Sequence, residues 1–112
     1  MKIPYSTQTV DMNDIKAVTK TLKSSFLTQG PTIAKFEKNI SKKVGAKFTT
    51  VVNSATSALH ISCMALDFKK KDILWTSPNT FAASANCALH LGGKVDFVDI
   101  DYKTGNIDID LL

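Results

Sequence analysis

Small hydroxyl residues follow an apolar, β-branched run in residues 51–59, and this stretch has the residue types of a binding site. The pattern predicts a strand, a tight turn and the N-terminus of a helix. The first turn of a helix leaves backbone N–H groups without internal partners, and its dipole favours negative charge. A phosphate bound there would accept hydrogen bonds from those groups and from the hydroxyls. Ser54 or Thr56 would equally serve as an ordinary helix cap, and the two interpretations are compatible.

The elements that position this stretch follow from apolar spacing along the chain. Helices are predicted over residues 11–23 and 32–44, on either side of a loop that contains Gly30 and Pro31. The later elements are predicted as a strand at 48–52, a helix at 55–66, a strand at 72–76, a helix at 80–91 and a strand at 95–100. This alternation is typical of an α/β fold in which helical crossovers connect a parallel sheet. We therefore expect an N-terminal helical segment over residues 1–47 and the start of an α/β domain over residues 48–112.

Two strand-to-helix junctions, residues 53–57 and 77–81, would lie at the same edge of such a sheet. Ligands of parallel sheets bind beyond the carboxyl ends of the strands, so the predicted phosphate site would share that edge with the ring of Phe81. The first junction has no glycine, and neither the dinucleotide fingerprint nor the Walker pattern is present. A ligand with one phosphate and one aromatic ring, such as pyridoxal 5′-phosphate (PLP), suits these residues better than a dinucleotide.

The bulk composition narrows the class of protein. With 112 residues, of which 44% are hydrophobic and 21% charged, the chain has the composition of one ordered domain at most. Its net charge of +4 comes from lysine alone, whereas proteins that read nucleic acids use arginine for bidentate contacts. The scattered lysines therefore indicate a solvated surface, and no nucleic-acid partner is expected.

Cysteine and histidine give no indication of a metal site. Cys63 and Cys87 lie in apolar helical patterns, which favours buried thiols in a reducing compartment. His60 and His90 also lie in helical patterns, and we interpret both as structural or exposed. The N-terminus has no apolar signal region and no run of membrane-spanning length, so a cytoplasmic protein without a membrane partner is expected.

Several motifs occur in the same order and with similar spacing as in the DegT-type sugar aminotransferases, which the chain resembles over residues 5–108. These are PLP enzymes of the aspartate-aminotransferase fold (fold type I), and the resemblance implies that the chain is the N-terminal part of their large domain. The motifs are Thr-Gln-Gly-Pro at 28–31, Asn-Ser-Ala-Thr-Ser-Ala-Leu at 53–59, Thr-Ser-Pro-Asn-Thr-Phe-Ala-Ala-Ser-Ala-Asn at 76–86, Val-Asp-Ile-Asp at 98–101 and Gly-Asn-Ile-Asp at 105–108.

The resemblance also implies roles for individual residues. Ala55, Thr56 and Ser57 would hold the cofactor phosphate, and Phe81 would stack on the pyridine ring. The sugar-nucleotide site would be lined by Tyr5, Ser25, Phe26, Leu27 and Thr28. The implied reaction transfers an amino group from an amino acid, usually glutamate, to the C4 ketone of a UDP-linked deoxy-keto-sugar. It belongs to polysaccharide or nonulosonic acid biosynthesis, and the implied enzyme is a homodimer.

The sequence departs from the family pattern at the residue that is central to catalysis. The Schiff-base lysine and the acidic partner of the pyridine nitrogen lie in motifs that are not found among these 112 residues, so no catalytic residue is assigned. A helix cap at Asp108 shortly before the last residue also suggests a truncated chain. We therefore expect an N-terminal fragment that is inactive alone. The alternatives are another PLP sugar transaminase, a dehydratase of the same family with His for Lys, a non-PLP nucleotide-binding α/β domain, or a basic interaction module.

Overall fold

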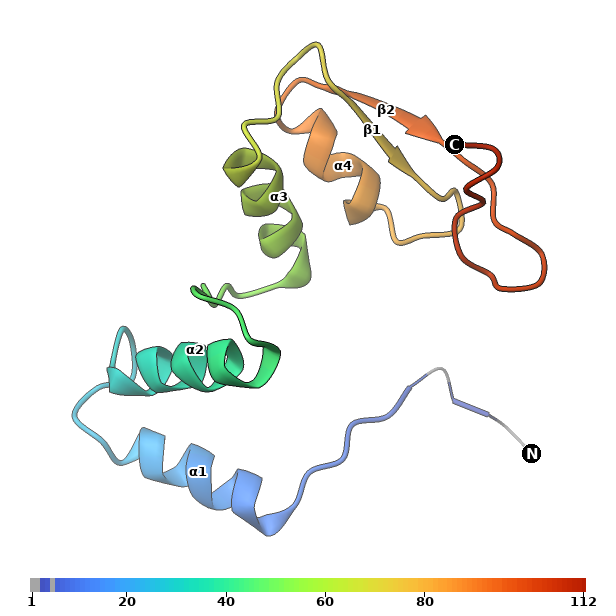
Figure 1. Ribbon diagram of the computed structural model, residues 1–112. Helices are drawn as coiled ribbons and strands as arrows, with labels where there is room; N and C mark the ends of the chain where they lie inside the picture. The colour runs from blue at the N-terminus through green and yellow to red at the C-terminus, as the bar shows by residue number, and fades with distance from the viewer. Residues whose placement is uncertain (1–2, 5) are drawn as a thin grey trace. The chain divides into compact units, whose positions relative to one another are not determined.

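The computed structural model describes residues 3–4 and 6–112, and it divides into two compact units. The first unit spans Met1–Val51 and the second Val52–Leu112 (Figure 1). The sequence pattern predicts a boundary between residues 47 and 48. Within the described residues, no helix is long and apolar enough to cross a membrane.

The first unit holds the two helices that the apolar spacing predicts, α1 (Met12–Leu22) and α2 (Pro31–Val44). Asp11 starts α1 with a capping box, in which its Oδ1 accepts from the Asn13 and Asp14 amides at 2.7 and 3.1 Å. The Asp14 carboxylate in return accepts from the Asp11 amide at 2.9 Å. α2 begins with a proline, which needs no amide partner there, and it ends at Gly45. The φ of Gly45 is +70°, a left-handed conformation that glycine adopts without strain.

The strand predicted at residues 48–52 is absent, and the prediction is wrong for the described chain. This segment is extended but makes side-chain contacts to α2 in place of a strand ladder. The Val51 amide donates to Glu37 Oε1 at 3.0 Å, and the Thr49 and Ser41 hydroxyls are 2.7 Å apart. A strand exists only when a neighbouring strand accepts and donates its backbone hydrogen bonds, and no described strand lies beside this one.

The second unit has the predicted α/β order, α3 (Ala55–Ala65), β1 (Ile73–Thr76), α4 (Ala83–Leu89) and β2 (Lys94–Phe97) (Figure 1). The two strands pair in parallel, with Ile73 opposite Lys94 and Thr76 opposite Phe97. The parallel arrangement confirms the predicted sheet type, and α4 is its crossover. α4 is shorter than the predicted helix at 80–91, because a turn precedes it and Gly92, at φ +74°, follows it. β2 likewise ends before residues 98–100 of the predicted strand.

α3 begins at one of the two residues that the sequence offers as a cap, Ser54 and Thr56. Ser54 has extended backbone angles, and its Oγ accepts a hydrogen bond from the Ser57 amide at 3.2 Å. The Ala58 amide then makes the first regular helical bond, to the Ser54 carbonyl at 3.1 Å. Ser54, and not Thr56, is therefore the N-cap of α3.

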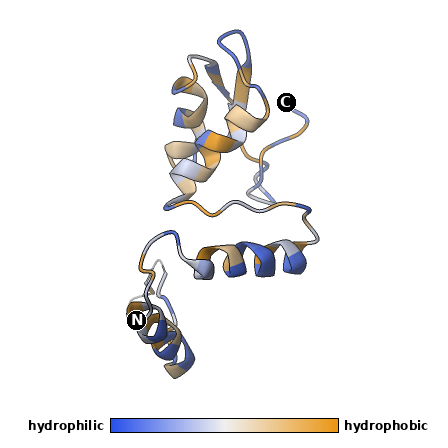
Figure 2. Cartoon of the chain, turned by 90° about the vertical axis from the view of Figure 1, so that its left-hand side faces the viewer, coloured by the Kyte–Doolittle hydropathy of each residue, from blue (hydrophilic) through white to orange (hydrophobic). Residues whose placement is uncertain are grey.

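The core of the second unit is small and is built around α4. α4 packs against both strands and against α3, and it supplies Ala83, Cys87 and Ala88 to the buried interior. Cys63 of α3 and Val98 after β2 complete the buried set. Figure 2 colours the chain by hydropathy. In the first unit, α2 carries both hydrophilic and hydrophobic residues.

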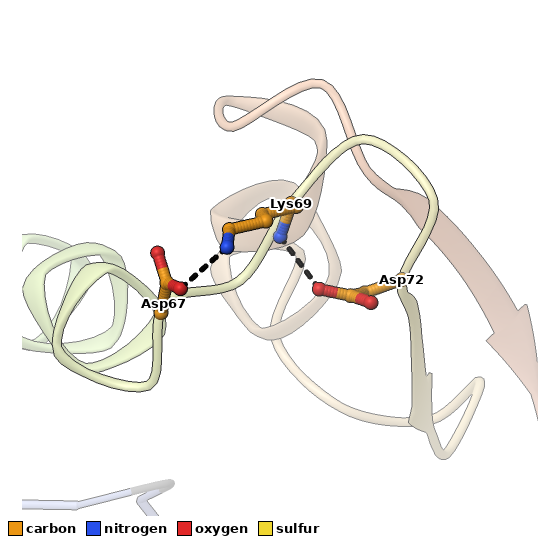
Figure 3. Close-up of polar contacts among 3 residues, drawn as sticks. All are labelled: Asp67, Lys69 and Asp72. Atoms are coloured by element: carbon orange, nitrogen blue, oxygen red, sulfur yellow. Dashed lines mark hydrogen bonds and ion pairs between the residues drawn. The ribbon is translucent and has the colours of Figure 1, made fainter.

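The loop from α3 to β1 carries the lysine run at residues 69–71. Lys69 Nζ forms an ion pair with Asp67 Oδ2 at 2.6 Å, and the Lys69 amide donates to Asp72 Oδ2 at 2.7 Å (Figure 3). Both charged side chains of the pair are largely exposed, so water screens their attraction and the pair adds little stability. The turn before β1 is closed by this bond and by the Asp72 amide, which donates to the Lys69 carbonyl at 2.9 Å.

A second turn, at residues 101–106, is closed by a carboxylate. Asp101 Oδ1 accepts from the Lys103 amide at 2.9 Å and from the Thr104 amide at 2.7 Å. These bonds, those from Thr104 above all, hold the pKa of Asp101 below its usual value because they stabilise the ionised form. Further on, Asp108 Oδ1 accepts from the Asp110 amide at 2.9 Å, which is a cap-type contact. The expected helix does not follow it within the described residues.

The Ser54 cap predicts a measurable loss of stability on truncation. Ser54→Ala removes the acceptor for the Ser57 amide and should lower the free energy of unfolding by about 1 kcal/mol, whereas Ser54→Asp keeps an acceptor and should preserve it. Urea unfolding of the three proteins measures the difference. Equal unfolding midpoints for the Ala and Asp variants would show that the cap contributes nothing.

The turn at Asp101 predicts a dependence on acid. Because the folded pKa lies below the unfolded value of about 3.9, the contribution of Asp101 to stability is complete above that pH and is lost as the pH falls through the folded pKa. A carbon-13 NMR titration of the Asp101 carboxyl should therefore have its midpoint below about 3.9. The chemical shift of the Thr104 amide should change with pH along the same curve. In Asp101→Asn this pH dependence should disappear. A carboxyl midpoint at or above the unfolded value would contradict the assignment.

Candidate functional site

The candidate site lies at the first turn of α3, where two backbone donors are free. Among the described residues, no hydrogen bond engages the amides of Ala55 and Thr56, the first two residues of the helix. The third amide, that of Ser57, is already bound to the Ser54 cap. The cap and the anion site therefore coexist in this turn, with two free amides and the positive end of the helix dipole available to a ligand.

The hydroxyl of Ser57 is oriented by a residue that the sequence prediction did not assign to the site. Ser57 Oγ donates to Asn53 Oδ1 at 2.8 Å, and the Ser54 and Ser57 hydroxyls are 3.1 Å apart. The Ser57 proton is thus directed toward Asn53, and the Ser57 oxygen remains able to accept a hydrogen bond. A signal for this role was present in the sequence, since Asn directly before a Ser/Thr-rich helix start commonly bonds to nearby backbone or hydroxyl groups.

Thr56 and Ser57 line an open hollow of about 520 Å³, together with His60, Ile61 and His90. The rings of His60 and His90 meet edge to face, with centroids 5.6 Å apart and an angle of 77° between planes. His60 is half-buried, and its Nδ1 is covered and has no hydrogen-bond partner among the described residues. Thr56 and His60 are four residues apart, so helical spacing would have placed them on one face.

The lining of this hollow suits an anion. Hydroxyl and imidazole groups line it, and no carboxylate is among the lining residues. No group of three or more His, Cys, Asp or Glu side chains in the described chain is arranged to hold a metal ion. A phosphate group therefore fits the residues that are present, because free amides, a threonine hydroxyl and a helix dipole all favour negative charge.

Phe81, the predicted stacking residue, lies in the loop between β1 and α4 and is 77% exposed. It is not among the residues that line the hollow at Thr56. Its neighbours Pro78 and Thr80 instead line a second hollow of about 370 Å³ with residues of α4 and β2, including Phe97. Both junctions, residues 53–57 and 77–81, were expected to follow strands at one sheet edge. Only the junction that contains Phe81 follows a strand in the structure, namely β1.

The predicted substrate loop belongs to the first unit. Ser25, Leu27 and Thr28 are exposed there, and so is Phe26, whose amide and carbonyl both bond to the Ser24 hydroxyl, at 3.3 and 3.0 Å. Gly30 ends the loop in close contact with Phe26, and a Cβ there would lie 2.7 Å from the Cβ of Phe26.

Two lysines lie beside the substrate loop. A hollow of about 370 Å³ adjoins it, and Lys20, Lys35, Ser24 and Phe26 are among its lining residues. Tyr5, also predicted to contact substrate, lies outside the described residues.

The two thiols of the chain are not arranged as nucleophiles. Cys63 and Cys87 are 6% and 3% exposed, and Cys87 Sγ donates to the Ser84 carbonyl at 3.2 Å. Burial raises the pKa of the Cys63 thiol, because it disfavours the charged thiolate. Cys63 therefore stays protonated and weakly nucleophilic at neutral pH.

Sequence comparison finds one family and several curated relatives. Residues 8–112 match the DegT/DnrJ/EryC1/StrS aminotransferase family. A UDP-4-amino-4,6-dideoxy-N-acetyl-beta-L-altrosamine transaminase from Campylobacter jejuni is 50% identical over 106 residues, which cover 95% of this chain and 28% of that protein. The spore coat polysaccharide biosynthesis protein SpsC of Bacillus subtilis is 42% identical over 95% of the chain and 27% of its own length. The chain thus spans little more than a quarter of these curated relatives.

Structural comparison agrees with the sequence match. The chain superposes on the Streptococcus pneumoniae protein Spr1654, described as a sugar aminotransferase, with a TM-score of 0.89 in the PLP form and 0.88 in the PMP form. The identity to the PLP form is 31%, over 99% of this chain and 28% of the other. The likeness confirms the expected fold, the N-terminal part of a fold type I large domain. With the family match over nearly the whole sequence, the chain belongs to the DegT/DnrJ/EryC1/StrS aminotransferase family.

Proposed function

We propose that this chain supplies the phosphate-binding turn of a PLP-dependent transaminase that acts on a UDP-linked deoxy-keto-sugar. The observation that carries the proposal is the pair of free amides at Ala55 and Thr56, at a helix start whose hollow is lined by hydroxyl and imidazole groups. The family membership and the PLP and PMP forms of the structural neighbour support the same cofactor.

The residues of the turn would divide the work of holding the phosphate. The Ala55 and Thr56 amides and the Thr56 hydroxyl would donate to phosphate oxygens, while Asn53 and Ser54 hold the turn in place through Ser57. The Ser57 hydroxyl would become a further donor only by leaving Asn53. PLP supplies, when bound, an electron-withdrawing ring that stabilises negative charge beside the transferred nitrogen. The contribution of the protein is orientation, since a fixed phosphate limits how the ring can turn.

Phe81 would stack on that ring. Its side chain is free to take this role because it is mostly exposed and does not fill the core of its unit. Aromatic rings gain from offset or edge contacts with another ring, in addition to the apolar area they bury. The distance from Phe81 to the phosphate turn depends on the packing of α4 against α3, since Phe81 lies two residues before α4.

The substrate side of the proposal rests on the loop of the first unit. Ser25, Phe26, Leu27 and Thr28, with Tyr5, would contact the sugar nucleotide. The hollow beside this loop combines two lysines with hydroxyl groups and an aromatic ring, which suits a diphosphate joined to a flat base. We further propose that the acceptor carbon is C4, that glutamate is the amino donor and that the enzyme is a homodimer.

The branch of the family is proposed from identity. The altrosamine transaminase relative is 50% identical, whereas an aminotransferase of UDP-4-amino-4-deoxy-L-arabinose from Shewanella sediminis is 31% identical. The pseudaminic acid branch is therefore favoured over the arabinose branch. The Schiff-base lysine is proposed to come from sequence outside these 112 residues, because none of the fourteen lysines has the family context and none lines the hollow at Thr56. The 112 residues alone should then not transaminate.

The phosphate site predicts a selective loss of affinity in Thr56→Val. A hydrogen bond to a charged group contributes about 1.5–3 kcal/mol, so the dissociation constant of pyridoxamine 5′-phosphate should rise about 10- to 100-fold in the full-length enzyme. Binding of pyridoxamine, which has no phosphate, should not change. Thr19→Val in α1 is the matched control and should bind like the wild type. Unchanged affinity in Thr56→Val, measured by fluorescence titration, would remove Thr56 from the site.

The stacking role predicts an order among three variants of Phe81. Phe81→Tyr keeps the ring and should resemble the wild type, while Phe81→Leu and Phe81→Ala remove it. The Leu and Ala variants should each shift the visible absorption band of the bound cofactor and weaken its binding by about 2- to 10-fold. Tyr102→Ala, at another exposed aromatic residue, should leave band and affinity unchanged. If Phe81→Leu keeps the wild-type spectrum and affinity, the ring does not stack on the cofactor.

A further inference from the structure

Asn53 lies directly before the N-cap of α3, and hydroxyl groups hold its side-chain carbonyl. Ser57 Oγ donates to Asn53 Oδ1 at 2.8 Å, and Ser54 Oγ donates to the same oxygen in a longer contact of 3.4 Å. Donors at a carbonyl oxygen stabilise the negative charge that develops there when a nucleophile attacks the carbonyl carbon. The side-chain amide of Asn53 is therefore activated toward attack at Cγ.

The backbone nitrogen of Ser54 is the nucleophile within reach of that carbon. Because it is covalently joined to Asn53, its attack closes a succinimide ring without an encounter between separate groups. In the part of the chain that the structure describes, no hydrogen bond engages the Ser54 amide. Serine has one heavy atom on its Cβ and so crowds the nitrogen less than a β-branched residue does. Both residues are exposed, so water reaches the ring.

The other asparagines of the chain lack this combination of features. The amide that follows Asn13 or Asn79 donates to another group, an Asp11 carboxylate oxygen in the first case and the Ser77 carbonyl in the second. The remaining asparagines either lie inside helices, where amides bond to the preceding turn, or precede a β-branched residue. They are Asn39 in α2, Asn86 in α4, and Asn106, which precedes isoleucine.

We propose that Asn53 is a deamidation site, at which the side-chain amide is converted to a carboxylate. The Ser54 nitrogen gives its proton to water and forms a bond to Asn53 Cγ. The bond from Cγ to Nδ2 then breaks, and Nδ2 takes a proton from water and leaves as ammonia. Water opens the succinimide ring on either side and yields aspartate or isoaspartate at position 53. The net reaction consumes one water and releases one ammonia, with no change in oxidation state.

The product would place a negative charge beside the free amides of Ala55 and Thr56. A carboxylate at a helix start interacts favourably with the dipole, but it repels a second anion at the same place. Deamidation would therefore weaken phosphate binding at this turn. This consequence rests on the proposed function, whereas the deamidation itself rests on the contacts of Asn53 and Ser54 alone.

Peptide mapping after mild alkaline incubation of the full-length, cofactor-free protein tests the reaction. Trypsin cleaves after lysine and releases the peptide 48–69, in which Asn53 is the only asparagine. We expect this peptide to gain the mass difference between a hydroxyl and an amino group, and to take up one heavy oxygen when the incubation is done in oxygen-18 water. The peptide 72–94, which contains Asn79 and Asn86, should keep its mass. An unchanged peptide 48–69, or a faster gain in peptide 72–94, would overturn the proposal.

Two variants test the roles of the neighbouring serines. Ser57→Ala removes the shorter hydroxyl contact and should slow deamidation by about 2- to 10-fold, the share of one hydrogen bond. Ser54→Thr keeps a cap hydroxyl but crowds the attacking nitrogen, so it should also slow the reaction. Ser62→Ala is the matched control, because the Ser62 hydroxyl donates to the Ala58 carbonyl within α3 and does not contact Asn53. A rate in Ser57→Ala equal to or above that of Ser62→Ala would contradict the activation of Asn53.

A separate measurement tests the consequence for phosphate binding. Asn53→Asp carries the charge of the product and should bind pyridoxamine 5′-phosphate about 5- to 10-fold more weakly than the wild type. Pyridoxamine, which has no phosphate, should bind both proteins equally. Equal affinity of the two proteins for the phosphate compound would count against the proposed phosphate site, while the peptide map alone decides whether Asn53 deamidates.

Discussion

The parallel pairing of β1 and β2 is the constraint on which the second unit depends. Two parallel strands cannot be joined by a tight turn, so the chain between them must return to the starting end of the sheet, and α4 is that return. Because α4 packs on both strands and on α3, its inward residues must be small, as Ala83, Cys87 and Ala88 are. The position of α3, and with it the proposed phosphate turn, therefore depends on the packing of this crossover helix.

At the start of α3, a structural cap and the proposed binding site lie in one turn. A helix start has more amides than a single cap can satisfy, so the Ser54 hydroxyl binds one amide and leaves those of Ala55 and Thr56 for a ligand. Asn53 accepts a hydrogen bond from the Ser57 hydroxyl and so holds that side chain in place. The residues that stabilise the turn and those that would bind phosphate are thus neighbours with separate tasks.

Many large apolar side chains of the described chain remain exposed, among them Phe48, Leu66, Phe81 and Ile109. The chain spans only about 28% of the relative with 50% identity, and the relatives therefore have much more polypeptide with which to cover equivalent surfaces. The missing strand at residues 48–52 and the exposed side chains have one cause in common, because neither has a neighbouring segment beside it among the described residues. An extended apolar segment becomes a strand only beside a partner, and the two formed strands pair with each other.

The sequence by itself determined the features that depend on neighbours along the chain. The approximate starts of α1 and α3, the end of α2 at Val44, the order of elements from α3 to β2 and the family all follow from apolar spacing, capping preferences and motif wording. Only the tertiary structure decided which extended segment is paired and that His60 and His90 lie beside Thr56 in one hollow. These facts depend on residues about 30 positions apart meeting through the packing of α4, and local sequence patterns carry no information about contacts at that separation.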